Sequence, residues 1–281
     1  MPSAGAPRVV TSREQGGPWH YRSLILNFAR RDLRARFKGS IFGLLWSLVV
    51  PLASLGIYAL VFGTFFKGNT PPTMGNGHGH PFAVWLFTGL VVWNMFATTL
   101  ATAIASLVGT GPLLKKIYFP AYASVYGSVL ATFYQSLIEV GILAITLAAY
   151  RNIGWTWLLL VAWAAIFGVF VAAVSVFFAV ANVYWRDVSH FIGIVLQLMF
   201  YLTPIIYPLT RVTQHFHGIA AASVIRILPI ASYVEVFRSL VYDLNLGAGR
   251  AWLTILGWAA LASLFAWLLY RKKGLDLSEE L

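Results

Sequence analysis

The sequence predicts an all-α protein that crosses a membrane several times, and two observations indicate this class. First, 59% of the 281 residues are hydrophobic and 10% are charged, whereas an ordinary soluble domain has about 25% charged residues. Second, six apolar runs are each long enough to cross about 30 Å of hydrocarbon as a helix of roughly 20 residues. We therefore expect one transmembrane domain over residues 20–270 with six spanning helices per subunit. The spans are predicted near residues 41–66, 82–108, 121–149, 156–184, 191–209 and 251–270.

The ends of the chain and its residue types argue against several kinds of site. Residues 1–19 are rich in Gly, Pro and Ser and have no apolar run, so we expect a disordered tail and no cleavable signal peptide. The chain has no cysteine, which excludes disulfides and thiolate chemistry. The histidines within 78–80 and 215–217 lack a neighbouring carboxylate to complete a tetrahedral set, so no metal is expected.

The distribution of basic residues predicts the orientation. Fourteen of the 20 Lys and Arg residues fall on the side that holds both termini, and six fall on the other side. Because positive charge is enriched in cytoplasmic loops, both termini and residues 109–120 are expected on the cytoplasmic side of the cytoplasmic (inner) membrane. Residues 271–281 would then be a cytoplasmic tail. The net charge of +11 is interpreted as a topology signal, and no nucleic-acid partner is expected.

Residues 20–38 form a predicted amphipathic helix before the first span. At helical spacing, Leu26, Ala29, Leu33 and Phe37 share one face. Such a helix suits the plane of the membrane interface among anionic headgroups. Two interpretations stay open, either orientation and lipid contact alone or an additional protein partner that rests against the helix. The basic residues of this interface helix are Arg30, Arg31, Arg34, Arg36 and Lys38.

The connection between the second and third spans reads "GTGPLLKKIYFPAY" over residues 109–122. Its prolines bound a predicted helix of about two turns, which is too apolar for a free loop. It is either a turn among headgroups with snorkelling lysines or a rigid segment that transmits force from a cytoplasmic protein. Arg186 and Asp187, at the inner end of the fourth span, are expected to form an ion pair. They are also candidates for a second contact with the cytoplasmic protein. The candidate contact residues in the connection are Pro112, Leu113, Leu114, Lys115, Lys116, Ile117, Tyr118 and Phe119.

The segment after the fifth span combines helix breakers with an apolar loop. Pro204 and Pro208 are expected to break or kink the span. Residues 210–250 are too apolar for a free loop, so we expect two short re-entrant helices that divide near Pro229. Two further spans are the competing interpretation. They are disfavoured because neither half reaches spanning length without a charged residue, namely Arg226, Glu235 or Arg238.

Polar side chains recur at helical spacing inside the second and third spans. Such stripes fit interhelical hydrogen bonding and a hydrated pathway about equally well. Glu139 is the one carboxylate well inside a predicted span, and it either faces a polar path or is a structural residue paired with Gln135. The candidate pathway residues of the two stripes are Asn94, Thr98, Thr102, Thr132 and Glu139. In the fourth span, small residues instead predict close helix packing: Gly168, Ala172, Ser175 and Ala179.

Four segments taken in order resemble the membrane subunit of ABC-type polysaccharide exporters, the family of permeases for O antigen, teichoic acid and capsule. They are "RDLRARFKGSIFGLLWSLVVPL", "GPLLKKIYFP", "VYWRDVSHFIGIVLQLMFYLTPIIYP" and "LPIASYVEVFRSLVY". The resemblance runs from about residue 20 to the end. It implies an interface helix over 20–38, a coupling helix over 111–119 and re-entrant helices over about 212–245 near the outer gate. The chain departs from the family at 110–112 and 228–229, where Thr-Gly-Pro and Leu-Pro stand in place of Asn-Pro.

The resemblance implies a homodimer that works with two copies of a separate ATPase and exports a lipid-linked glycan. The sequence contains no Gly-Lys dipeptide and so no Walker A loop. ATP and Mg are therefore expected in the partner, and this chain is expected to have no cofactor or enzymatic activity of its own. Aromatic rings are candidates for sugar stacking, although an interfacial belt explains single rings as well: Trp85, Trp93, Tyr201 and Tyr207.

Three other functions compete with polysaccharide export as explanations of this sequence. An ABC-type exporter of a drug or small lipid would have the same fold. A membrane glycosyl- or phosphotransferase needs clustered carboxylates for a metal and a diphosphate, whereas the nine acidic residues here are scattered. A proton-coupled carrier is disfavoured because one buried acid does not make a relay.

Overall fold

A computed structural model describes residues 21–38, 46–61, 72–77, 79, 81–116, 119–209, 212, 215–216, 219–273 and 277. The predicted all-helical class is confirmed. The exception within these residues is a hairpin of two residues per strand, in which His215 pairs with Ala220. The elements in chain order are α1 (Arg22–Phe37), α2 (Trp46–Leu60), α3 (Phe82–Gly109), α4 (Gly111–Leu114), α5 (Tyr122–Ala149), the 3₁₀ turn η3 (Trp155–Leu159), α6 (Leu160–Tyr184), α7 (Val188–Leu202), β1 (His215–Phe216), β2 (Ile219–Ala220), α8 (Ala221–Ile227), α9 (Pro229–Val241) and α10 (Gly249–Lys273).

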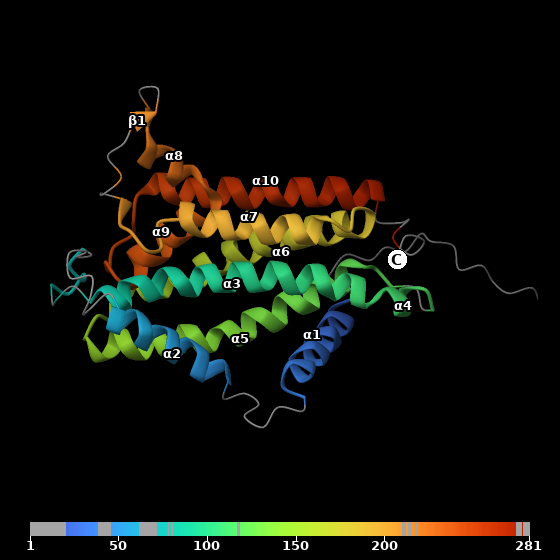
Figure 1. The fold of residues 1–281 in the computed structure, drawn as a ribbon, viewed down its shortest axis with the longest axis horizontal. Helices are drawn as coiled ribbons and strands as arrows, with labels where there is room; N and C mark the ends of the chain where they lie inside the picture. The colour runs from blue at the N-terminus through green and yellow to red at the C-terminus, as the bar shows by residue number, and fades with distance from the viewer. Residues whose placement is uncertain are drawn as a thin grey trace, which may run out of the picture.

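The long helices form an elongated bundle (Figure 1). α3 packs on α5 and α6, and α6 packs on α10. α1 leans across α5 near the end of the bundle that carries α4 and the end of α10, which we call the α4 end. α8, α9 and the hairpin lie toward the opposite end, which we call the α9 end. The chain therefore places different short elements at the two ends of one bundle.

Four helices among the described residues are long and apolar enough to cross a membrane. They are Phe82–Gly109, Tyr122–Ala149, Trp155–Tyr184 and Gly249–Lys273, and each coincides with a predicted span. Two further apolar helices, Leu48–Leu60 and Val188–Leu202, are shorter. At 1.5 Å per residue, the 15 residues of α7 cover roughly 22 Å, less than the hydrocarbon thickness of about 30 Å.

Prolines set the boundaries of the short elements. α7 ends at Leu202, and Thr203 is extended with ψ 135°, because the residue before Pro204 is disfavoured in the helical region. Pro229 stands in the first turn of α9, where its missing N–H costs nothing. The expected division near Pro229 is present, since α8 ends at Ile227.

The core consists of two clusters of buried side chains. The larger one surrounds α9 and contains a chain of rings in which Trp163 stacks on Phe167 with centroids 4.8 Å apart. The Tyr233 hydroxyl donates to Ile255 O at 2.9 Å and ties α9 to α10. The smaller cluster lies at the α4 end, where Leu277, a residue of the expected tail, is buried.

The buried face of α1 differs from the one predicted. Ile25, Phe28 and Ala29 are buried, whereas Leu26 is 47% exposed. Gly127 of α5 explains the difference, because a Cβ at this position would lie 2.5 Å from the Phe28 Cβ. The close approach of the two helices fixes which side of α1 is buried, and the pattern within α1 alone does not contain this information. The side chain of Phe37, the expected tail at residues 1–19, and Ile117 and Tyr118 of the coupling segment lie outside what is described.

Candidate functional site

A polar seam runs between α3 and α5. Asn94 Nδ2 donates to Glu139 Oε2 at 3.4 Å, and the hydroxyls of Thr102 and Thr132 are 3.2 Å apart. Thr102 Oγ1 also donates to the carbonyl oxygen of Thr98 at 2.7 Å. The structure thus brings together the five polar pathway candidates of the two spans. We call these five residues, together with Gln135, the α3–α5 polar seam.

Arg36 of α1 enters this seam from the side. Its Nη2 donates to Thr132 Oγ1 at 2.7 Å, and its Nη1 donates to Gln135 Oε1. Desolvation lowers the pKa of Arg36, and the charge of Asp32 partly offsets this effect. Gln135 therefore accepts a hydrogen bond from Arg36. The partner of Glu139 is Asn94 rather than the Gln135 expected from the sequence.

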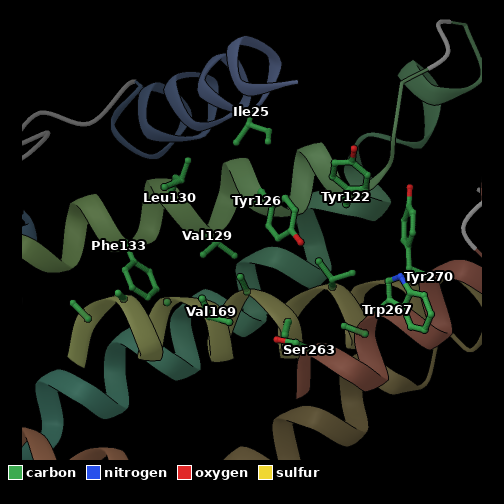
Figure 2. A pocket seen from close by; sticks show the side chains of 17 residues that line it. Ile25, Tyr122, Tyr126, Val129, Leu130, Phe133, Val169, Ser263, Trp267 and Tyr270 are labelled. Atoms are coloured by element: carbon green, nitrogen blue, oxygen red, sulfur yellow. The ribbon is translucent and has the colours of Figure 1, made fainter. Parts of the chain in front are cut away.

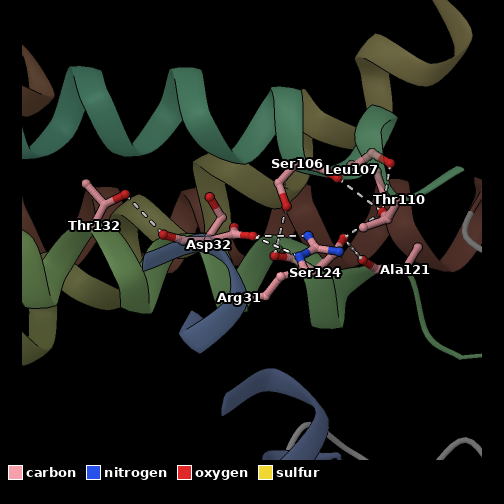
Figure 3. A network of polar contacts seen from close by, with 9 residues as sticks. Arg31, Asp32, Ser106, Leu107, Thr110, Ala121, Ser124 and Thr132 are labelled. Carbon is pink, nitrogen blue, oxygen red and sulfur yellow. Dashed lines mark hydrogen bonds and ion pairs between the residues drawn. The ribbon is translucent and has the colours of Figure 1, made fainter. Parts of the chain in front are cut away.

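The other basic residues of α1 face outward. Arg30, Arg31, Arg34 and Lys38 are exposed. Arg31 pairs with Asp32 at 3.0 Å, and this pair is drawn beside α5 in Figure 3. α1 therefore has one arginine committed to the bundle and a basic outer face that is available to headgroups or to a partner.

Hydroxyls in the seam and next to it also bond to their own helix. Thr132 Oγ1 donates to Ser128 O at 3.1 Å, and Ser136 Oγ donates to Thr132 O at 3.0 Å. Thr132 is 2% exposed, whereas Asn94 and Thr98 are exposed. One part of the seam thus serves helix packing, and its Asn94–Thr98 side remains open to the surroundings.

The segment after α3 turns tightly. Thr110 Oγ1 donates to Leu107 O at 2.9 Å and approaches Ser124 Oγ at 3.3 Å, so it joins the end of α3 to the start of α5 (Figure 3). α4 covers four residues, which is shorter than the expected two turns. Leu114 and Phe119 are both 8% exposed, and the Phe119 ring lies 5.4 Å from that of Phe28 on α1.

Four of the expected contact residues in this segment are at the surface. Pro112, Leu113, Lys115 and Lys116 are exposed. Leu114 and Phe119 instead hold the segment onto α1 and α3 within the smaller core cluster. A partner at the α4 end would therefore meet two lysines, one leucine and one proline of this segment.

Arg186 and Asp187 are both exposed at the junction of α6 and α7. Within the described residues no ion pair joins them, because the one such pair is Arg31–Asp32. Asp187 precedes the first residue of α7, and Arg186 O accepts from Ser189 Oγ at 3.1 Å. Both side chains are therefore accessible at the surface and are not paired with one another.

Arg238 of α9 is a buried cation. From the sequence, it was considered only as a charged residue that argues against a further span. It is 8% exposed, and its guanidinium lies 3.8 Å from the centroid of the Trp85 ring. It donates to Pro204 O at 3.0 Å, Trp85 O at 3.3 Å, Ile205 O at 3.5 Å and Thr88 Oγ1 at 3.1 Å. The carbonyls after α7 have lost their helical partners, and Arg238 supplies donors for them.

The four ring candidates fall into different environments. Trp85 is buried under Arg238, and Trp93 is 7% exposed and packs on Phe200 with centroids 5.5 Å apart. Tyr201 is 64% exposed. The Tyr207 hydroxyl donates to Leu202 O at 3.0 Å and so stabilises the end of α7. Of the four rings, Tyr201 has the face most available to a sugar.

Sequence reasoning missed Arg36 as a member of the seam and Arg238 as a central contact. A signal existed for Arg238, since an arginine in the stretch "ASYVEVFRSLVY" is costly in an apolar environment unless its donors are used. No comparable signal existed for Arg36, which is one of several arginines on α1. Within the described residues, no three His, Asp or Glu side chains gather in a metal-binding arrangement.

The long apolar helices around this seam define an integral membrane protein. The ABC-2 type transporter family matches residues 23–242, and the chain belongs to this family. An O-antigen export system permease protein RfbA of Klebsiella pneumoniae is 28% identical over 221 residues, which cover 77% of this chain and 79% of the relative. The RfbA protein of Myxococcus xanthus is 26% identical over 228 residues, with 80% and 82% covered. The chain is thus an ABC-2 permease that is similar to permeases of O-antigen export systems.

Proposed function

We propose that this chain is the membrane subunit of an ATP-driven exporter that moves a lipid-linked polysaccharide across the cytoplasmic membrane. The observation that carries the proposal is the similarity to O-antigen export permeases over about three quarters of the chain. The family match includes most of α1, the α3–α5 polar seam and α9. This chain undergoes the conformational change, and a separate ABC ATPase binds ATP and Mg.

In this proposal α2 and α7 complete six spans, and α8 and α9 are re-entrant helices at the outer side. The contacts of Arg238 support this assignment, because irregular backbone at membrane depth is tolerated only where protein satisfies its polar groups. The carbonyls of Pro204 and Ile205 have such a donor in Arg238. A chain that crosses six times has both termini on one side.

The α4 end faces the cytoplasm in this proposal and receives the ATPase. Exposed basic residues gather here, with Lys115 and Lys116 on the turn after α4 and Arg271, Lys272 and Lys273 in the last turn of α10. They agree with the enrichment of positive charge in cytoplasmic loops. The turn after α4 would be the main contact, and Arg186 with Asp187 would provide the second.

Two copies of this chain and two copies of the ATPase form the proposed transporter. The open side of the seam, with Asn94 and Thr98 exposed, would face the second copy and supply polar groups to the path of the glycan. Glu139 lies beside Asn94 and would contribute to the same path. Tyr201 is the ring proposed to stack on sugars near the end of α7.

The experiment combines a test of the cargo with a test of the partner. Depletion of this chain in its own cells should make a lipid-linked polysaccharide accumulate on the cytoplasmic side, and the restored gene should clear it. If a drug or small lipid accumulates instead while lipid-linked glycans stay constant, the cargo assignment is wrong. The purified chain should hydrolyse no ATP by itself, because it has no Walker A loop.

The contact with the ATPase is tested by Leu113→Asp. Leu113 is 38% exposed, so the substitution leaves the core intact but places a carboxylate in an apolar contact. We expect ATPase co-purification to fall about tenfold or more. Arg250→Ala, at an exposed site at the start of α10 and so at the opposite end of the bundle, is the control and should leave co-purification unchanged. Retention of the ATPase and of export by Leu113→Asp would show that the turn after α4 is not the contact.

A further inference from the structure

A groove of about 700 Å³ lies between α5 and α10, with α6 as its floor and α1 at one edge (Figure 2). α5 and α10 both pack on α6 but make little contact with each other. Most residues of the floor are small, among them Ala165, Gly168 and Ala172. The predicted small face of the fourth span is thus only partly used for close helix packing, because Gly168 and Ala172 leave space above them.

The length of the groove corresponds to one leaflet of a bilayer. Its lining on α5 runs from Tyr122 to Phe133, roughly 16 Å at 1.5 Å per residue, which is about half of the 30 Å hydrocarbon core. A spanning helix of a second subunit would need a face that continues through both leaflets. An extended chain of one leaflet matches the groove better.

One end of the groove is aromatic and basic. The rings of Tyr122 and Tyr270 are 5.4 Å apart and join α5 to α10 at the α4 end, where Figure 2 shows them near Trp267. The guanidinium of Arg271 lies 5.2 Å from the centroid of the Trp267 ring. Toward the other end the lining is aliphatic and aromatic, with Val169 and Phe133. This sequence of groups complements an anionic headgroup followed by a hydrocarbon chain.

We propose that the groove binds one anionic phospholipid of the leaflet at the α4 end. One acyl chain lies over Gly168 and Ala172, and the phosphate lies beside Arg271. Ile25 of α1 belongs to the lining, so a bound lipid also supports the position of α1 against α5. The site is separate from the α3–α5 polar seam and does not depend on which cargo the transporter carries.

The test uses the purified full-length chain in detergent, to which phosphatidylglycerol or phosphatidylcholine is added. Native mass spectrometry counts the lipids that remain bound to each chain as the gas-phase energy rises. We expect one tightly retained phosphatidylglycerol per chain and weaker retention of phosphatidylcholine. Arg271→Gln should reduce the preference for phosphatidylglycerol about fivefold, the effect of one basic residue near an anionic lipid.

Gly168→Leu tests the chain-binding part of the groove. A Cβ at Gly168 would lie 3.5 Å from its nearest neighbour, Phe133 Cε1, so the backbone tolerates the substitution while the leucine fills the groove. We expect retention of phosphatidylglycerol to fall about tenfold, because a filled groove has no room for a chain. Gly257→Leu on α10 is the matched control, since a Cβ there meets nothing within 4 Å and Gly257 does not line the groove.

Three results would overturn the proposal. Gly168→Leu could retain phosphatidylglycerol as the unchanged chain does, or the two lipids could be retained equally. Alternatively, Gly168→Leu could convert a dimer into monomers without a change in bound lipid, which would make the groove an interface between copies. Failure of the cargo test leaves these measurements unaffected, because they need neither ATPase nor glycan.

Discussion

Two arginines hold short helices against different parts of the same bundle, and they use different kinds of acceptor. Near the middle of α5, Arg36 holds α1 through the side chains of Thr132 and Gln135. At the α9 end, Arg238 holds α9 chiefly through backbone carbonyls of α3 and of the segment after α7. Arg36 is half-buried and Arg238 is buried. Removal of Arg36 would therefore take a donor from two side-chain acceptors, whereas removal of Arg238 would take the donor from buried backbone carbonyls.

The difference indicates which of the two short helices is fixed and which can adjust. The carbonyls of Pro204 and Ile205 follow the end of α7 and would lose donors if Arg238 moved, and a buried acceptor without a partner is costly. Thr132 already bonds to Ser128 O in its own helix, and Gln135 is partly exposed. α1 can therefore shift at lower cost than α9, as a helix that responds to a cytoplasmic ATPase would need to do.

The largest expected effect comes from Arg238→Ala. It removes four donated hydrogen bonds and the cation over Trp85, and we expect a loss of about 3–5 kcal/mol, because several buried acceptors lose their donor at once. The measurement is the monodisperse fraction after heating in detergent, followed by size-exclusion chromatography. Arg250→Ala, at an exposed arginine of α10, is the control and should behave like the unchanged chain.

Arg238→Lys separates the contribution of the charge from that of the hydrogen-bond donors. A lysine keeps the charge but lacks the planar fork of donors, so it should recover only part of the stability. If Arg238→Ala were as stable as Arg250→Ala, the carbonyls after α7 would have another source of donors and the contrast between Arg36 and Arg238 would fail.

The second prediction concerns Asp243, two residues after the end of α9. Burial raises the pKa of Asp243 to about 6, and the charge of Arg238 partly offsets this effect. An acid with a raised folded-state pKa stabilises the fold at low pH, and this contribution disappears as pH rises from about 4 to 6 because the unfolded state releases its proton first. The loss is about 3 kcal/mol at most, from 1.36 kcal/mol per unit of pKa.

The measurement is the midpoint of thermal unfolding between pH 4 and 7. The unchanged chain should lose stability toward pH 6 and change little above it, whereas Asp243→Asn should lack this dependence. Asp187→Asn, at an exposed carboxylate, should keep the profile of the unchanged chain. A profile of Asp243→Asn that still falls between pH 4 and 6 would assign the proton to another group.

The sequence was sufficient for the parts of the structure that depend on composition along the chain. Apolar length predicted the four long helices, and the prolines at 204 and 229 predicted the end of α7 and the division between α8 and α9. It was insufficient where a contact depends on a distant residue. The buried face of α1 is decided by Gly127, about a hundred positions away, and the partner of Glu139 is on another helix.

In the candidate site, too, the sequence did not predict contacts that depend on distant residues. Helical spacing correctly grouped the polar residues of α3 and α5, because residues four apart share a helix face. It did not show that Arg36 joins them, because nothing in the sequence distinguishes Arg36 from the other arginines of α1, which were all assigned to a basic outer face. It also did not separate Leu114 from Leu113, of which one is buried in this chain and the other is exposed.

The third prediction tests how closely α1 must approach α5. A Cβ at Gly127 would lie 2.5 Å from Phe28 Cβ and 3.0 Å from Ile25 O, so Gly127→Ala must push α1 away. We expect a loss of about 1–3 kcal/mol, as for overpacking elsewhere, together with faster proteolysis between α1 and α2. Gly141→Ala on the same helix is the matched control, since a Cβ there meets nothing within 4 Å. Equal proteolysis of the two variants would show that α1 does not depend on this approach.

The smallest expected effect on stability, and the most informative one for mechanism, comes from Arg36→Gln. Glutamine can still donate to Thr132, and the acceptors that Arg36 leaves can bond within α5 or to water, so we expect a loss of about 1 kcal/mol. The effect on transport should be larger, because α1 would no longer follow α5 when the ATPase acts. Export and ATP hydrolysis should therefore be measured together in membranes that contain both subunits. We expect hydrolysis to persist while export per ATP falls, and Arg34→Gln, at an exposed arginine of the same helix, to leave both unchanged. If Arg36→Gln instead destabilises the chain as much as Arg238→Ala does, α1 is held as rigidly as α9 and does not act as an adjustable link.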